Sequence, residues 1–292
     1  MLRAVTPGGH PLITGLWLAG LAGLGIAVGG AVAVSAGPLV VGLACVAAAL
    51  LVAGFVAYQL RLRRFSATLV AAEEALDAGE LERARDLVAP LFARFPTFPL
   101  VQEVAADVLY AAGDPLSAAS LWEGAMKRLG GARIAPRLVA AYAALNRGGD
   151  ARRVAALAPD DPSTRLAITW SELVATGGDR ERGAALADGI ARDRSLSVTP
   201  SSEAMASAIV AIAAARRGDR SATVAAIEAA QRVRQRLRAH DAAFVGYLVA
   251  VALRELGDVA DARAVFTSAL DSAPDSIGGA LARRERSHLL VV

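Results

Sequence analysis

The chain has few of the residues that build metal sites and redox centres. Among its 292 residues are one cysteine, Cys45, and three histidines, His10, His240 and His288, which lie far apart in the sequence. A lone cysteine cannot form an intramolecular disulfide. No histidine has a second histidine or a glutamate at the spacing of a zinc site, and no Gly-Lys pair of a phosphate-binding loop occurs. We therefore expect no metal, no cofactor and no catalytic residue.

Aromatic residues and net charge are also scarce. Aromatics make up 5% of the chain, and its formal net charge is +3. A net charge this small predicts no nucleic-acid-binding surface. Hydrophobic residues nevertheless reach 55%, mostly alanine, leucine and valine, and alanine is the strongest helix former. The composition predicts an all-α protein, and nothing in it indicates a small-molecule substrate.

Two long uncharged segments lie near the start of the chain. Residues 12–34 and 38–60 contain no Asp, Glu, Lys or Arg, and about 20 apolar residues are enough for a helix to cross the hydrocarbon core of a membrane. Only a tight turn separates the segments, which predicts an antiparallel pair of transmembrane helices. Two alternatives stay open. The segments could be a pair of buried core helices, or the first could be a signal peptide cleaved after Ala36. The first segment is longer than the apolar region of a usual signal peptide.

Small residues recur at every fourth position in both segments. Residues at this spacing lie along one stripe of a helix and let two helix backbones approach closely in a membrane. We therefore expect the two transmembrane helices to pack along these stripes. The predicted packing residues are Gly15, Ala19, Gly23, Ala27 and Ala31 in the first segment, and Ala49, Ala53 and Ala57 in the second.

Arginines flank the pair of segments on one side only. Arg3 precedes the first segment, and Arg61, Arg63 and Arg64 follow the second, whereas the turn between the segments is uncharged. Because basic residues are retained on the cytoplasmic side of a membrane, both termini are expected in the cytoplasm. Everything after Arg64 should then be cytoplasmic as well.

Six Gly-acid pairs recur through the rest of the chain at spacings of 29 to 40 residues. A period in this range is typical of stacked helix–turn–helix units, each too small to bury its own apolar face. We therefore expect about six helical hairpins over residues 65–276, with the turns at the pairs. The pairs are Gly79-Glu80, Gly113-Asp114, Gly149-Asp150, Gly178-Asp179, Gly218-Asp219 and Gly257-Asp258.

Three of these units resemble the tetratricopeptide repeat, a 34-residue helix–turn–helix. Residues 65–98 have Gly79, Ala84 and Pro96 at the matching positions. The closer matches are residues 99–132, with Gly113, Ala118, Trp122 and Ala125, and residues 243–276, with Gly257, Ala262, Phe266, Ala269 and Pro274. The middle is less regular, since Pro159 and Pro162 should stop one second helix near Leu157. A general helical solenoid is therefore the alternative to regular tetratricopeptide repeats.

The resemblance implies a protein-binding groove lined by the first helix of each repeat. The positions that would line the groove differ between the three repeats. They are Glu73 in the first, Glu103, Asp107 and Tyr110 in the second, and Phe244, Tyr247 and Arg254 in the last. Three carboxylates at the membrane-proximal end would favour a ligand segment with basic and apolar residues, because opposite charges promote docking. The alternative is that these carboxylates are ordinary solvated helix-face residues.

The layout of two N-terminal spans followed by repeats resembles that of the membrane-bound repeat protein encoded with heme-synthesis enzymes in proteobacteria. The likeness is one of layout, since the turn between the spans is far shorter here and no motif is shared. It implies a scaffold or adaptor in a bacterial inner membrane that binds other proteins and contacts the lipid bilayer. A stoichiometric subunit of a larger membrane machine is the alternative. The expected organisation is a membrane hairpin over 1–64, repeats over 65–276 and a tail over 277–292.

Overall fold

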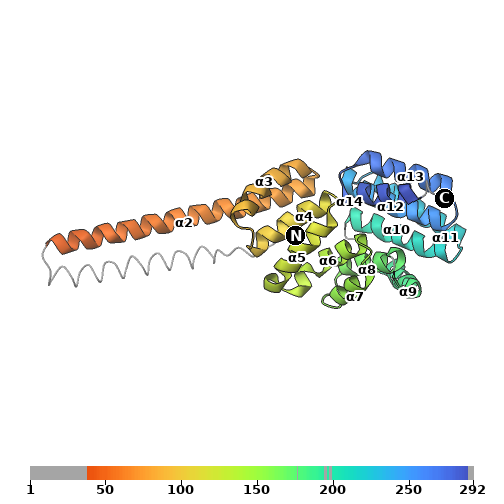
Figure 1. Ribbon diagram of the computed structural model, residues 1–292, viewed down its shortest axis with the longest axis horizontal. Coiled ribbons are helices and arrows are strands. Elements are labelled where there is room, and N and C mark those ends of the chain that lie inside the picture. The colour runs from red at the N-terminus through yellow and green to blue at the C-terminus, as the bar shows by residue number, and fades with distance from the viewer. Residues whose placement is uncertain (1–37, 176, 194–195, 197–198, 289–292) are drawn as a thin grey trace. The chain divides into compact units, whose positions relative to one another are not determined.

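The computed structural model describes residues 38–175, 177–193, 196 and 199–288, and within them the chain is helical, with no strand (Figure 1). The all-α prediction is therefore confirmed. The chain divides into two compact units, Met1–Ser66 and Ala67–Val292. The thirteen helices of the described residues are α2 (Pro38–Ala78), α3 (Leu81–Arg94), α4 (Pro99–Ala111), α5 (Pro115–Leu129), α6 (Gly131–Ala144), α7 (Gly148–Ala155), α8 (Pro162–Val174), α9 (Arg180–Arg192), α10 (Pro200–Arg216), α11 (Arg220–Arg234), α12 (Ala239–Glu255), α13 (Val259–Ser272) and α14 (Ile277–His288).

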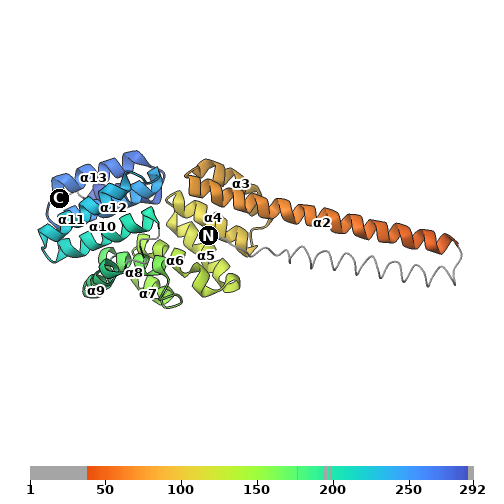
Figure 2. The same cartoon turned by 180° about the vertical axis from the view of Figure 1, so that it is seen from behind.

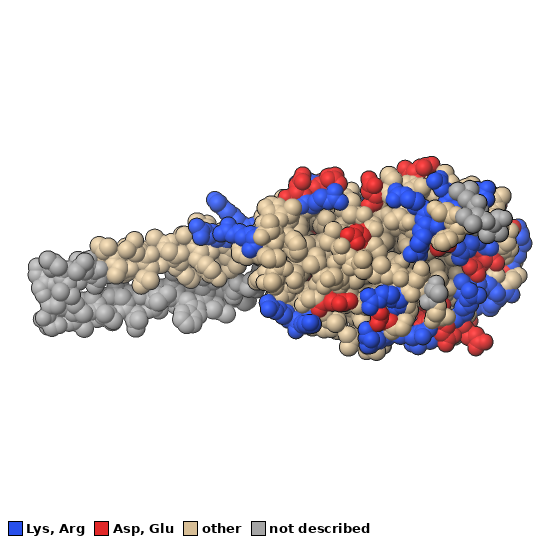
Figure 3. Space-filling view, in the orientation of Figure 1, with Lys and Arg blue, Asp and Glu red and all other residues tan. Residues whose placement is uncertain are grey.

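The second uncharged segment is helical over its whole length, as part of α2. In the described part of the chain, Cys45–Ala78 is the one helix long and apolar enough to cross a membrane. Its apolar side chains from Val46 to Val56 are mostly exposed, and Figure 3 shows no charged side chain along the apolar part of α2 that it displays. The stripe residues Ala49, Ala53 and Ala57 are exposed on it.

The first uncharged segment, residues 12–34, lies outside the described residues. Its five predicted packing residues also lie outside the described residues. The prediction of a two-helix membrane hairpin therefore stays a prediction. The residues concerned are Gly15, Ala19, Gly23, Ala27 and Ala31.

The Gly-acid pairs mark helix turns because of one local hydrogen-bond pattern. At the end of α2, Gly79 has a φ of +79°, and its N–H donates to the Leu76 carbonyl while the Glu80 N–H donates to the Ala75 carbonyl. This is the Schellman motif, in which a left-handed residue after the helix satisfies the last carbonyls, and glycine adopts that conformation at no steric cost. The turns at Gly113, Gly218 and Gly257 repeat it.

Two of the six predicted turns are displaced. The third turn is at Asn146 (φ +59°), after α6 has ended at Ala144, so that Gly149 and Asp150 lie inside the first turn of α7. Asparagine tolerates the left-handed conformation because its short polar side chain bonds locally. In the fourth turn the residue with positive φ (+81°) is Gly177, one position before the predicted Gly178.

The acidic member of each pair often begins the next helix. The side chains of Asp114, Asp179 and Asp219 accept a hydrogen bond from the backbone N–H three residues later, which satisfies one of the free donors of a helix N-terminus. The expected truncation of the third unit is confirmed, since α7 has eight residues. Helix α8 then begins at Pro162, where proline is well tolerated.

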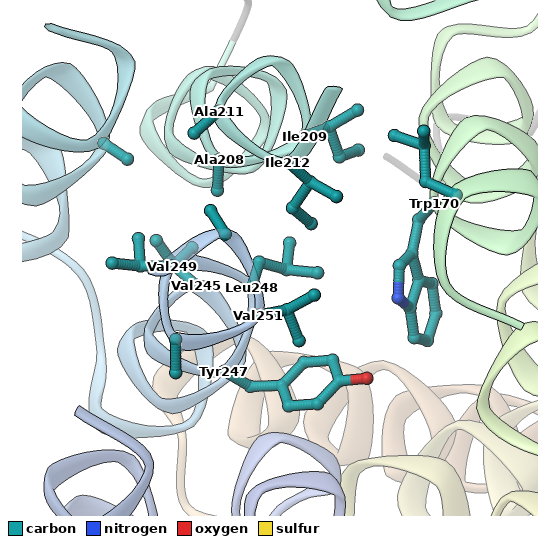
Figure 4. Packing of buried hydrophobic residues seen from close by; sticks show 14 of the residues in the cluster. Trp170, Ala208, Ile209, Ala211, Ile212, Val245, Tyr247, Leu248, Val249 and Val251 are labelled. Atoms are coloured by element: carbon teal, nitrogen blue, oxygen red, sulfur yellow. The ribbon is translucent and has the colours of Figure 1, made fainter. Parts of the chain in front are cut away.

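Small residues lie where the helices meet. Ala118 and Ala262, expected at such contacts, are fully buried, as are Trp122 and Phe266. Helices α10 and α12 lie side by side in both ribbon views (Figures 1 and 2). Figure 4 shows how the alanines and isoleucines of α10 face the valines and leucines of α12, with Trp170 of α8 beside them.

The stretch expected as a C-terminal tail contains α14, which packs on α12 and α13. Its glycines explain how closely it approaches α12. A Cβ placed on Gly278 would lie 2.3 Å from the backbone nitrogen of Phe244, a distance that no side chain accommodates. The last helix is thus an integral layer of the repeat unit.

Candidate protein-binding face

The predicted carboxylates of the first two hairpins gather around two arginines of α6. Arg133 donates two hydrogen bonds to Glu103, Nε to Oε1 at 3.0 Å and Nη2 to Oε2 at 2.8 Å. Arg137 donates from Nε to Asp107 at 2.8 Å and lies 3.3 Å from Glu103. Glu103 is 2% exposed. The side chains of α4 and α6 are therefore joined by a nearly buried ion-pair network.

Glu73 faces this network from α2 without a partner of its own. In the described residues it makes no ion pair or hydrogen bond, yet it interacts electrostatically with Asp107, Glu103 and Arg137. Among the described residues, three carboxylates share two guanidinium groups, Arg133 and Arg137, so the negative charges of this group outnumber the positive charges by one when all are ionised. We call these five side chains the carboxylate cluster.

Burial and the neighbouring negative charges raise the pKa values of Glu73 and Asp107. Burial, followed by the neighbouring charges of Asp107 and Glu103, raises the pKa of Glu73 to about 7. Burial also raises the pKa of Asp107 to about 6, although Arg137 opposes the shift. A carboxyl whose pKa is raised by folding stabilises the folded state below its unfolded value, and this contribution is lost as the pH rises through the folded pKa. For Glu73 the loss spans about pH 4.5 to 7.

Aromatic side chains from α4, α5, α8 and α12 pack together and include three further predicted residues, Tyr110, Phe244 and Tyr247. The ring of Tyr110 lies 5.6 Å from that of Trp122, and Trp170 meets Phe244 edge-on at 5.0 Å. Phe244 in turn stacks on Tyr247 at 6.2 Å. Burial raises the pKa of both Tyr110 and Tyr247 above the ordinary value for tyrosine.

Three polar atoms of this aromatic group are buried without a hydrogen-bond partner in the described structure. They are Nε1 of Trp122, Nε1 of Trp170 and Oη of Tyr247. Tyr247 itself is 0% exposed, and Figure 4 shows it near Trp170. Trp122 nevertheless opposes the rise in the pKa of Asp107, and Trp170 opposes that of Tyr247, so the two indole N–H groups lie close to these polar side chains.

The last predicted groove residue, Arg254, belongs to a ladder of ion pairs. Arg216 of α10 bonds Glu255 of α12 at 3.1 Å, and Arg254 of α12 bonds Glu255 at 3.0 Å and also Glu285 of α14. Successive first helices of the hairpins are thus linked through alternating charges. Arg254 therefore has two carboxylate partners within the unit.

The predicted site residues thus form two groups, and whether they line a binding groove stays a prediction. Glu73, Glu103 and Asp107 lie together, and so do Phe244 and Tyr247. The sequence reasoning missed Arg133 and Arg137. A signal was present, because they stand four residues apart, 30 residues after the equally spaced Glu103 and Asp107, so each pair lies on one face of its helix.

A second buried polar cluster was also missed. Glu172 of α8 is 1% exposed and accepts two hydrogen bonds from Arg152 of α7, at 2.6 and 2.7 Å, and one from the backbone N–H of Asp179 at 2.7 Å. Burial alone would raise the pKa of Glu172, but these bonds, with the charges of Arg152 and Arg182, lower it below the ordinary value. The cluster ties the short helix α7 to α8 and to the turn before α9.

The residues that the structure describes include no group of three or more His, Cys, Asp or Glu side chains placed to hold a metal ion. No protein-family model matches the chain. A comparison with curated proteins likewise found no match.

Proposed function

We propose that this protein is a membrane-anchored scaffold of the tetratricopeptide type, which binds other proteins and helps to assemble or hold a membrane complex. The observation that carries the proposal is the half-buried carboxylate of Glu73, which has no ion pair in the described residues and interacts with Asp107, Glu103 and Arg137. A carboxylate without an ion pair among the described residues offers an attachment point for an external cation.

The partner segment that fits this face has basic and apolar residues. A lysine or arginine side chain would supply the missing positive charge at Glu73, and apolar side chains would contact the nearby part-exposed Tyr110. Glu103 and Asp107 are poor first contacts, since Arg133 and Arg137 already satisfy them. Glu73 is therefore the residue on which recognition depends.

The membrane part of the proposal rests on α2 and the arginines that follow its apolar part. The exposed apolar surface of α2 extends over more residues than a soluble helix normally leaves uncovered. We place the chain in a bacterial inner membrane as a multi-pass protein with both termini in the cytoplasm, because Arg61, Arg63 and Arg64 lie at the end of the apolar part.

The proposed topology predicts where a reporter after Val292 lies. A green fluorescent protein fused there should fluoresce in the membrane fraction, and alkaline phosphatase fused at the same position should be inactive, since it matures only outside the cytoplasm. Replacing Arg61, Arg63 and Arg64 together by alanine should weaken this preference. An active phosphatase fusion to the unchanged chain would show that the proposed orientation is wrong.

Reversing the charge of Glu73 is expected to reduce partner capture at least tenfold. The experiment compares the proteins captured by three full-length chains solubilised from membranes: the unchanged chain, Glu73→Lys and Glu74→Lys. The second variant is the matched control, because Glu74 is the exposed neighbour on the same helix. Proteins recovered by the unchanged chain and by Glu74→Lys, but not by Glu73→Lys, are the expected partners.

The pH dependence of capture gives an independent check. Because a bound cation favours ionised Glu73, affinity should rise between pH 6 and pH 8, as the carboxyl with a pKa of about 7 loses its proton. The stability contributed by Glu73 changes in the opposite direction over this range. Equal capture by both lysine variants, together with no pH dependence, would contradict a role for Glu73 in binding.

The alternative is a stoichiometric subunit docked through its membrane helices. The observation that favours it is the exposed stripe of Ala49, Ala53 and Ala57 on α2, since small residues let a second helix approach closely. The exposed thiol of Cys45 lies on the same helix. Crosslinking through it to a single foreign membrane protein would favour a fixed subunit, whereas recovery of soluble partners through Glu73 would favour a scaffold.

A further inference from the structure

Helix α14 contacts hairpins that precede it by more than 130 residues. Nη1 of Arg284 donates a hydrogen bond of 2.9 Å to the carbonyl of Ala144, the last residue of α6. That carbonyl is at a helix C-terminus, where backbone acceptors lack an intrahelical partner and a cation is favoured. Arg284 therefore links the end of the chain to the third hairpin.

The start of α14 also contacts the turn of the second hairpin. A Cβ placed on Gly113 would lie 3.1 Å from Cβ of Ala280 and 3.2 Å from the carbonyl oxygen of Ser276. The turn between α4 and α5 thus approaches α14 so closely that only glycine fits without a shift. Gly113 has two roles here, because its φ of +76° is also needed for the turn itself.

A cleft of about 800 Å³ adjoins these contacts. One side is formed by the turn between α2 and α3, from Leu76 to Arg83, and the other by Arg238–His240 and by Ala273–Ser276. In the described residues no ion pair or side-chain hydrogen bond crosses from the first two hairpins to α12, α13 or α14. We call this boundary, with the cleft and the contacts of Gly113 and Arg284, the seam.

The seam is weaker than the packing between successive hairpins. In a repeat array each unit is stabilised mainly by its neighbours, and contacts between distant units only close the array. Here the closing contacts are few. They are the hydrogen bond of Arg284, the approach of Gly113 to Ser276 and Ala280 and that of Gly79 to His240, and the packing of Tyr110 on the cluster that contains Tyr247. Weakly held boundaries of this kind are where proteins open without unfolding.

We propose that α14 is a latch, and that the repeat unit opens along the seam when the contacts of Arg284 and Gly113 break. Opening separates the second hairpin from the last one and gives a partner access to the aromatic side chains of α4 and α12. In the closed form Tyr247 is inaccessible. The latch is a property of the unit itself and does not depend on which partner binds Glu73.

Distances between two spin labels test the latch directly. The full chain in detergent would have Cys45→Ser, and labels on cysteines introduced at Leu116 and Ser287, which are exposed next to the seam on opposite sides. Arg284→Ala should enlarge a longer-distance population, raising the ratio of open to closed molecules roughly threefold to tenfold, as expected for the loss of one hydrogen bond. Arg286→Ala is the control and should leave the ratio unchanged, because Arg286 makes no hydrogen bond or ion pair across the seam in the described residues.

Gly113→Ala provides a second, independent way to open the seam, because its methyl group would press on Ser276 and Ala280. Its control is Gly218→Ala, which has a similar φ of +73° but no atom within 4 Å of the added carbon. We expect a longer-distance population in Gly113→Ala and not in Gly218→Ala. An unchanged single distance in both Arg284→Ala and Gly113→Ala, or equal changes in their controls, would overturn the latch. The distance measurement needs no partner. Its result therefore neither supports nor contradicts the proposed binding at Glu73.

Discussion

Replacing Glu103 and Asp107 together by arginine is expected to unfold the first three hairpins of the repeat unit. The substitution leaves Arg133 and Arg137 without their carboxylates and adds two further positive charges beside them. Removing one partner of a buried ion pair costs about 3–5 kcal/mol, and two such losses approach the whole stability of many domains, about 5–15 kcal/mol. Circular dichroism should show a loss of helix, and limited proteolysis should cleave between α2 and α6.

The matched control is Glu82→Arg with Asp86→Arg on α3. It makes the same change of charge at the same spacing, but both side chains are exposed, so it should cost less than about 1 kcal/mol. Restoring opposite charges, with Arg133→Glu and Arg137→Glu added to the double variant, should recover part of the helical signal. A double variant as stable as the control would show that the ion pairs between α4 and α6 do not hold these hairpins together.

The second large effect is expected for Glu172→Ala. It removes the acceptor of three hydrogen bonds, which leaves the N–H of Asp179 without its acceptor and the guanidinium of Arg152 with the Gly177 carbonyl alone. Because the Arg152 side chain is 34% exposed, water offsets part of the loss, and we expect about 2–4 kcal/mol of destabilisation. For a unit of this size the midpoint of thermal unfolding should fall by roughly 5–15 °C.

Glu181→Ala is the control for this variant, since Glu181 is an exposed carboxylate in the first turn of α9. Its loss should lower the midpoint by no more than roughly 2–4 °C, from the weaker interaction with the helix dipole. Glu172→Gln should lie between the two, because an amide keeps one acceptor but loses the charge. A midpoint for Glu172→Ala equal to that of Glu181→Ala would mean that the short helix α7 is held by its apolar contacts alone.

The expected effect of reversing Glu103 and Asp107 shows where sequence reasoning is limited. From the pattern alone, Glu103 and Asp107 are expected to face a groove and to be open to a ligand. The structure assigns them to the interior of an ion-pair network. The spacing of Glu103 and Asp107 predicts that they share a helix face, but it does not say that Arg133 and Arg137 lie opposite, because that depends on how α6 is placed against α4.

The sequence by itself determined the helices and most of their turns. A glycine in the left-handed conformation followed by a helix-capping aspartate is a local arrangement of a few residues, so Gly113-Asp114 and Gly218-Asp219 specify their turns wherever the helices go. The third turn was displaced because Asn146 can replace glycine there. The uncharged segment over 38–60 likewise specified its own helix.

Only the tertiary structure decided which residues meet across the repeats. Trp170 meets Phe244 and Arg284 meets the carbonyl of Ala144 because each hairpin is rotated by the packing of all those between them. Small residues specify that two helices approach each other. They do not specify how far one hairpin is rotated relative to a distant one, because that rotation accumulates over the contacts of all the hairpins between them. For this reason the position of Glu73 beside Asp107 and Arg137, and the seam at α14, were recognised only with the helices in place.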